Sequence, residues 1–302
     1  MGTPVIRSAP RLDPRLWQIA SLTGLLIYGL ARLDFDITPA RAALVLISAL
    51  LAQWLATRLA RLPKFDPKSA LISALSLCLL LRTGEAWIAV LAAALAIGSK
   101  FLIRVRGKHV FNPTNFALVA TILLTRRAWV SPGQWGNVAF FAFLIACVGG
   151  RVVQRASRSD VTFAFLVSYA ALLFGRMAWL GQKPAVPLHQ MENGAFLLFA
   201  FFMISDPRTT PDSRAGRFAF GALVALGAAF VTFHLYRPNG LLWSLAAFSL
   251  VVPLIDRLLP GGRYAWPTNV LAPGNLHPEN RHETNPDAAR RVPVPGPAAL
   301  GA

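Results

Sequence analysis

The sequence is poor in charged residues and in cysteine, and each shortage narrows the class of protein. Only 14% of the 302 residues are charged and 55% are hydrophobic, whereas soluble globular domains carry about 25% charged residues. This composition predicts an integral membrane protein. The two cysteines, Cys78 and Cys147, lie in apolar stretches, which indicates small buried side chains rather than disulfides or thiolate metal ligands.

Motifs of soluble enzymes are missing as well. The sequence contains no glycine-rich dinucleotide loop, no P-loop, no nucleophile elbow and no HExxH pair, and its five histidines are too scattered to share a metal ion. We therefore expect no metal site and no self-contained catalytic motif. Whether the chain is an enzyme stays open at this point.

Acidic residues are scarce relative to basic ones. There are 30 Lys and Arg against 13 Asp and Glu, which gives a formal net charge of +17. In a soluble chain such an excess would suggest a nucleic-acid partner. Here the basic residues form no long block and lie between apolar runs, so the predicted partner is the lipid bilayer and not nucleic acid.

Ten apolar segments follow one another along the chain. A bilayer core about 30 Å thick needs roughly 20 mostly apolar residues per helix. The segments are 16–31, 39–57, 69–81, 86–103, 115–125, 137–153, 161–180, 193–205, 218–236 and 241–259. The third, fifth and eighth are short, which is typical of tilted, re-entrant or broken helices. We predict an all-α, polytopic membrane protein of about ten transmembrane helices.

The distribution of Lys and Arg orients these segments. Cytoplasmic loops carry the basic excess, and placing both termini in the cytoplasm assigns most of the basic residues, including Lys100, to that side. This predicts a multi-pass protein of a bacterial-type inner (plasma) membrane. Residues 1–15 are a cytoplasmic N-terminal segment, 16–259 the transmembrane domain, and 260–302 a Pro-rich, disordered cytoplasmic tail. The short third and eighth segments occupy matching places in two five-segment halves, which points to an inverted repeat.

The first of two polar segments lies where a basic cytoplasmic loop re-enters the membrane. Asn112 is a good helix N-cap, Pro113 is a good first helical residue, and Lys108 and Asn115 flank them. The simplest interpretation is helix initiation. The functional interpretation is an anion or polar-cofactor site at the positive end of the helix dipole.

The second polar segment follows a short apolar run and begins at Asp206. Asp206 or Thr210 could cap a helix begun by Pro207 or Pro211, and that structural role is the default. An acidic residue directly beside an apolar run is costly unless it is paired or functional, and Arg208 is its nearest candidate partner.

We hypothesise that the two polar segments converge on one cofactor or ion site. The residues assigned to a non-covalent cofactor are Lys108, Asn112, Pro113, Asn115, Asp206, Thr209 and Thr210.

Three stretches carry a resemblance to a known family. Residues 110–115 (VFNPTN), 200–211 (AFFMISDPRTTP) and 252–257 (VPLIDR) resemble the best-marked stretches of one membrane component. It is shared by the sodium-pumping NADH:quinone reductase, where it is called NqrB, and the Rnf electron-transport complex, where it is called RnfD. The resemblance covers residues 69–259. It implies ten transmembrane helices in two inverted halves and the passage of electrons through flavins, including an FMN esterified to a threonine.

The sequence departs from this family in one important place. The family's flavin-bearing threonine lies in a Ser-Gly-Ala-Thr type motif within a long outer insertion, whereas here residues 125–136 form a short loop without that motif. Arg82-Thr83-Gly84 also replaces the family's double-proline turn. The chain thus resembles a short stand-alone variant, for which covalent FMN is not expected.

The leading hypothesis is a membrane electron-transport component that keeps a non-covalent flavin or quinone contact and works with a redox partner subunit. Two alternatives stay open. One is a channel or transporter for a small solute or ion on the same inverted-repeat scaffold. The other is a subunit that only anchors its partners.

Overall fold

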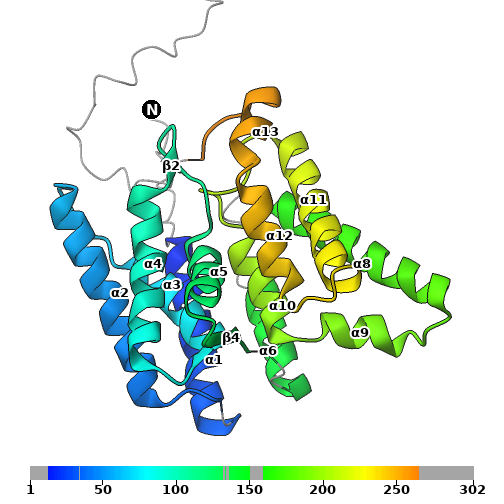
Figure 1. Cartoon of the computed structure of the whole chain (residues 1–302), viewed down its shortest axis with the longest axis horizontal. Helices are drawn as coiled ribbons and strands as arrows, with labels where there is room; N and C mark the ends of the chain where they lie inside the picture. The colour runs from blue at the N-terminus through cyan, green and yellow to red at the C-terminus, as the bar shows by residue number, and fades with distance from the viewer. Residues whose placement is uncertain (1–12, 34, 132, 134–135, 150–158, 265–302) are drawn as a thin grey trace, which may run out of the picture. The chain divides into compact units, whose positions relative to one another are not determined.

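The computed structural model describes residues 13–33, 35–131, 133, 136–149 and 159–264, and their regular structure is almost entirely helical (Figure 1). The helices are α1 (Pro14–Arg32), α2 (Pro39–Leu59), α3 (Lys68–Leu80), α4 (Ala86–Leu102), α5 (Pro113–Thr125), α6 (Gly136–Gly149), α8 (Ser159–Leu180), α9 (Ala185–Met191), α10 (Gly194–Leu198), the π-helical turn η1 (Phe199–Met203), α11 (Arg214–Phe233), α12 (Gly240–Ser249) and α13 (Val252–Leu258). Each predicted apolar segment coincides with one helix or with two consecutive ones. The prediction of a mainly helical protein is confirmed.

Several of these helices have the length and apolarity needed to cross a membrane. Within the described ranges α2, α8 and α11 meet both requirements, and the pair α12 and α13, bent by 50° at its break, makes a fourth span if it is counted as one. Helices α3 and α5 have 13 residues each, which is about 20 Å at 1.5 Å per residue. They are therefore shorter than a bilayer core, and the number of crossings stays a prediction.

Local sequence fixes the starts of α1, α2 and α5 in the same way. The side chains of Asp13, Thr38 and Asn112 each accept a hydrogen bond from a backbone N–H in the first turn. Proline then occupies the first helical position, where its missing N–H costs no helical hydrogen bond. The predicted N-cap role of Asn112 is confirmed.

Two short antiparallel strand pairs, which the sequence did not predict, lie between the helices. Strand β1 (Leu81–Thr83) pairs with β4 (Ala128–Val130), and β2 (Arg104–Val105) pairs with β3 (Lys108–His109). The β2–β3 turn places Arg106 and Gly107 at φ values of 52° and 79°, as a tight type I′ hairpin requires at both central positions. This hairpin presents Lys108 and His109 just before the start of α5.

The helices pack in two groups that meet along α5 and α12. In the first group α4 packs on α2 and α5, and α3 packs on α1 and α2; in the second, α11 packs on α8 and α12. Close approach depends on small residues, because a side chain at Gly221 of α11 would meet the Val161 carbonyl oxygen and Ala164 of α8 at 3.0 Å. Such small-residue contacts are typical of helix pairs in membranes.

The ends of the chain are largely beyond what can be described. Residues 1–12, most of the predicted N-terminal segment, and residues 265–302, most of the predicted tail, lie outside the described residues. Residues 260–264 have no regular secondary structure. They follow the loop before α11 closely, because a side chain at Gly261 would meet the backbone nitrogen of Ser213 at 2.5 Å.

Candidate functional site

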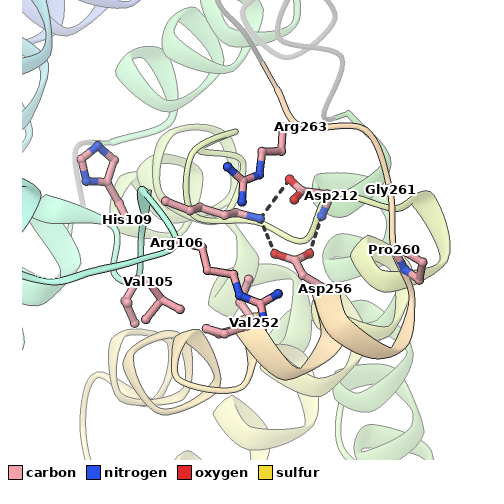
Figure 2. Close-up of a pocket in the computed structure, with 12 residues that line it drawn as sticks. Val105, Arg106, His109, Asp212, Val252, Asp256, Pro260, Gly261 and Arg263 are labelled. Atoms are coloured by element: carbon pink, nitrogen blue, oxygen red, sulfur yellow. Dashed lines mark hydrogen bonds and ion pairs between the residues drawn. The ribbon is translucent and has the colours of Figure 1, made fainter. Parts of the chain in front are cut away.

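Three segments that are distant in the sequence meet around one ammonium group (Figure 2). The Nζ atom of Lys108 lies 3.0 Å from Oδ1 of Asp212 and 2.7 Å from Oδ2 of Asp256. The other oxygen of Asp256 accepts a hydrogen bond of 2.7 Å from the backbone N–H of Asp212. We call these three residues the Lys108 cluster. It ties strand β3 to the loop after η1 and to helix α13, and all three side chains are largely buried.

A second contact joins the two predicted polar segments directly. The side-chain amide of Asn112 donates to the backbone oxygen of Met203 at 3.3 Å and to Oδ2 of Asp206 at 3.4 Å. The amide oxygen of Asn112 simultaneously accepts from the backbone N–H of Asn115 at 3.1 Å and caps α5. Asn112 therefore serves both interpretations at once, since it initiates a helix and holds the half-buried Asp206 carboxylate beside that helix.

The segment after Asp206 forms a closed turn and not the start of a helix. The backbone oxygen of Asp206 accepts from the backbone N–H groups of Thr209 and Thr210 at 3.1 and 3.2 Å. Helix α11 begins only at Arg214, capped by Ser213. The predicted start at Pro207 or Pro211 is thus wrong. A residue before proline is driven out of the α conformation, so Pro211 prevents the turn from continuing as a helix.

The predicted partner of Asp206 makes its contact through the backbone. The Arg208 backbone N–H donates to Oδ1 of Asp206 at 3.0 Å, and Nη1 of Arg208 lies 3.4 Å from Nε2 of His109. Burial raises the pKa of Asp206 above its ordinary value, and the hydrogen bond and charge of Arg208, with the charge of Lys100, oppose that rise. The turn therefore holds a carboxyl group whose proton affinity is increased by its surroundings.

The remaining predicted residues lie in the protein interior. Pro113 is the buried first residue of α5, and Asn115, with no exposed surface, donates from Nδ2 to the backbone oxygen of Leu242 in α12 at 3.2 Å. Thr209 and Thr210 are also buried. Of the seven predicted residues, Lys108 is the one that lines both cavities described next.

An open cleft lies beside the Lys108 cluster. One cavity of about 170 Å³ lies between the β2–β3 hairpin, α13 and residues 260–263. A neighbouring cavity of about 280 Å³ shares Lys108, His109, Asp212 and Arg263 with it. We call the two together the Lys108 cleft. Figure 2 shows Arg106 and Arg263 near the paired carboxylates of the cluster.

The lining of the Lys108 cleft combines positive charge with apolar wall. Arg106, Arg208 and Arg263 line it in addition to the Lys108 cluster, so its basic side chains outnumber its acidic ones. Val105 and Val252 contribute apolar surface. This combination suits a ligand that has an anionic or oxygen-rich end and a flat apolar body.

His109 is the buried titratable group at the edge of this cleft. Only 8% of its surface is exposed. Burial lowers the pKa of His109 to about 4, and the positive charges of Arg104, Arg208 and Lys100 lower it in the same direction. His109 is consequently neutral near pH 7 and can accept a hydrogen bond from Arg208.

Lys100 corrects the predicted loop boundaries. The prediction placed it in a cytoplasmic loop, but it lies in α4, is 5% exposed, and donates from Nζ to the backbone oxygen and hydroxyl of Ser69 at 2.9 and 3.0 Å. A lysine in the last helical turn can reach back along the helix with its long apolar stem. Hydropathy counts alone do not reveal that reach.

Sequence reasoning also missed the acidic half of the cleft. Asp256 lies within the last apolar segment, so the argument applied to Asp206, an acid against an apolar run, would have found it. Asp212 and the arginines gave no such signal, because their roles depend on contacts across 104 and 148 residues of chain.

Apolar helices of membrane-spanning length and a polar, basic cleft at the helix ends define a helical membrane protein with a binding cleft at the ends of its helices. The comparisons with known proteins refine that class. Residues 125–264 match the model of the NQR2, RnfD, RnfE family. The resemblance predicted from the sequence is confirmed.

Several curated relatives are named as the RnfD component of an ion-translocating oxidoreductase complex. The protein from Cronobacter sakazakii is 33% identical over 158 residues, which cover 50% of this chain and 41% of that protein. The protein from Escherichia coli strain K12 / DH10B is 33% identical over 127 residues, 41% of this chain and 34% of that protein. The aligned part of this chain thus spans between a third and about two fifths of these relatives.

Proposed function

We propose that this chain is a membrane-embedded electron-transport subunit of the RnfD and NQR2 type, working with a separate redox partner subunit. The observation that carries the proposal is the position of the family-matched segment in the site. Residues 125–264 supply Asp206, Asp212 and Asp256, and all three carboxylates are held by Lys108 or Asn112 at the start of α5. The relatives' names, which describe components of an ion-translocating oxidoreductase complex, give the same direction.

The helix contacts support the proposed inverted repeat of five and five spans. The packing of α2 on α4 has its counterpart in α8 on α11, and α4 on α5 has its counterpart in α11 on α12. Likewise α1 packs on α3 as α6 packs on α10, while α1 meets α6 and α5 meets α12 across the halves. In this arrangement both termini and the Lys108 cleft face the cytoplasm of an inner membrane.

We place the non-covalent flavin or quinone contact in the Lys108 cleft. The cleft fits the chemistry of such a group, because Arg106, Arg208 and Arg263 can hold phosphate or carbonyl oxygens, and Val105 and Val252 can face a flat ring. When bound, the group would supply the reversible electron uptake that side chains lack. Asn112 and Asp206 would fix the neighbouring helix start rather than touch the ligand, since they are held by each other.

Covalent attachment of FMN is not part of the proposal. The loop between α5 and α6 is short and lacks the family's flavin-bearing motif. A flavin on this chain should therefore leave with the supernatant when the protein is denatured with acid, and denatured protein run on a gel should not fluoresce. Fluorescence that stays with the polypeptide would contradict this point.

A binding titration tests the cleft. FMN and a short-chain ubiquinone are titrated against the protein in mild detergent, and binding is followed by quenching of flavin or tryptophan fluorescence. The variant R106Q/R263Q should weaken binding of at least one ligand tenfold or more. The matched control R61Q/K64Q removes two exposed basic residues beyond α2 and should bind like wild type. Equal affinity in both variants would refute the assignment to the cleft.

A further inference from the structure

A second cluster of basic side chains lies beyond the end of α3, one helix length away from the Lys100 contact at Ser69. Arg82 in strand β1 is only 3% exposed. Its Nη1 atom donates to the backbone oxygens of Cys78 and Leu81 at 3.0 and 2.9 Å, and its guanidinium carbon lies 5.9 Å from the ring centre of Phe35. Its buried Nε atom has no hydrogen-bond partner among the described residues.

Arg41 has a matching unsatisfied atom. Arg41 lies in the first turn of α2, and its Nη2 atom donates to the backbone oxygen of Gly84 at 3.1 Å. Its Nη1 atom is buried, and no acceptor for it lies within the described part of the chain. Arg41 and Arg82 line the same small cavity, which has a volume of about 20 Å³. Two guanidinium groups with unused donors thus face a space that holds a single small particle.

The charge balance of this cavity is positive. Asp36 also lines it, but Asp36 is exposed, and within the described ranges it makes no ion pair with Arg41 or Arg82 at 4 Å or less. Arginine does not lose its proton in proteins, and a buried donor without an acceptor is destabilising by roughly 1–3 kcal/mol, or more for a charged group. The two arginines therefore need a partner that accepts hydrogen bonds and carries negative charge.

We propose that Arg82 and Arg41 form a binding site for one small monovalent anion of the size of chloride. The cavity volume excludes sulfate and phosphate, and the apolar neighbours Val45, Leu77 and Ala89 disfavour an ion that keeps its hydration shell. A water molecule could accept the hydrogen bonds but would leave the charge uncompensated. The bound anion would link the start of α2 to strand β1 and would stabilise the fold. This site is independent of the Lys108 cleft.

Thermal unfolding in mild detergent tests the proposal, with sodium chloride compared with sodium gluconate at equal ionic strength. Chloride and bromide should raise the melting temperature of wild type in a saturable way, and gluconate should not. R82Q and the milder variant R41Q should lose this dependence. The control R32Q, which removes an exposed arginine in the last turn of α1, should keep it. The same melting temperature in chloride and gluconate for wild type would overturn the proposal.

Crystals grown with bromide provide a direct second measurement. An anomalous peak between the guanidinium groups of Arg82 and Arg41 would support the site. Density for a water molecule only, with no anomalous signal at high bromide concentration, would overturn it even if R82Q failed to fold. Ligand binding in the Lys108 cleft is a separate readout, so failure of either assignment can be recognised without the other.

Discussion

Acid sensitivity centred on His109 is the most quantitative consequence of the structure. Burial and the nearby cations lower the pKa of His109 from 6.5 to about 4. A group whose pKa is lower in the folded state binds protons more readily when the chain is unfolded. The neutral histidine therefore contributes its full stability above about pH 6.5, and this contribution is lost as the pH falls from there towards 4.

The magnitude follows from the difference in pKa between the two states. Proton linkage over this difference gives a loss of about 2 kcal/mol between pH 7 and pH 5, and of about 3 kcal/mol by pH 4. The side chain is only 8% exposed, so solvent screening reduces these values little. The variant H109Q cannot take up the proton and retains an oxygen that can accept a hydrogen bond from Arg208.

The assay is unfolding by sodium dodecyl sulfate in mixed micelles, repeated at pH 7, 6 and 5. The free energy of unfolding of wild type, relative to H109Q, should fall by about 2 kcal/mol across this range. The control H189Q changes an exposed histidine in α9 and should follow wild type at every pH. Parallel pH profiles for wild type and H109Q would refute the reasoning, and ring NMR titration of His109 would locate the error.

Three further variants test the packing. Asp160 and Arg217 are 11% and 8% exposed and lie 2.5 Å apart, so R217Q alone should cost about 3–5 kcal/mol, and D160N/R217Q should cost less than the two single changes added, as a double-mutant cycle of unfolding free energies would show. Gly221→Leu should separate α8 from α11 and lower the melting temperature by several degrees; an unchanged melting temperature would contradict the packing. Lys108→Met should destabilise the hairpin by leaving the Asp256 carboxylate without its cation, and adding D256N should restore part of the lost melting temperature; no recovery would argue against the ion pair.

The sequence predicts those parts of the fold that depend on local interactions. Apolar length and N-cap chemistry locate the helices, and Asn112 and Pro113 mark the start of α5 to the residue. The β2–β3 hairpin was missed because its strands have two residues each, too few for a periodic pattern. Its turn was readable in principle, since Arg106-Gly107 ends in the residue that most easily adopts positive φ.

The site could be predicted only in part, because its contacts are not local. Asn112 and Asp206 were placed together correctly, but Lys108 was predicted to face a cofactor alone and is in fact paired with two carboxylates. Arg208 was expected to pair with Asp206 through its charge, yet its guanidinium group lies against His109. Which of several nearby ions a flexible cation contacts is decided by the packing of distant segments, and a single sequence does not contain that packing.

The central claim is that this chain is an electron-transport subunit whose Lys108 cleft contacts a non-covalent flavin or quinone. The most direct test is the visible absorbance spectrum of the protein purified in mild detergent, recorded before and after addition of FMN or quinone and then after anaerobic reduction. The account predicts a bound chromophore that is bleached on reduction, that is released by acid, and that is lost in R106Q/R263Q. A colourless protein that takes up neither flavin nor quinone would contradict it.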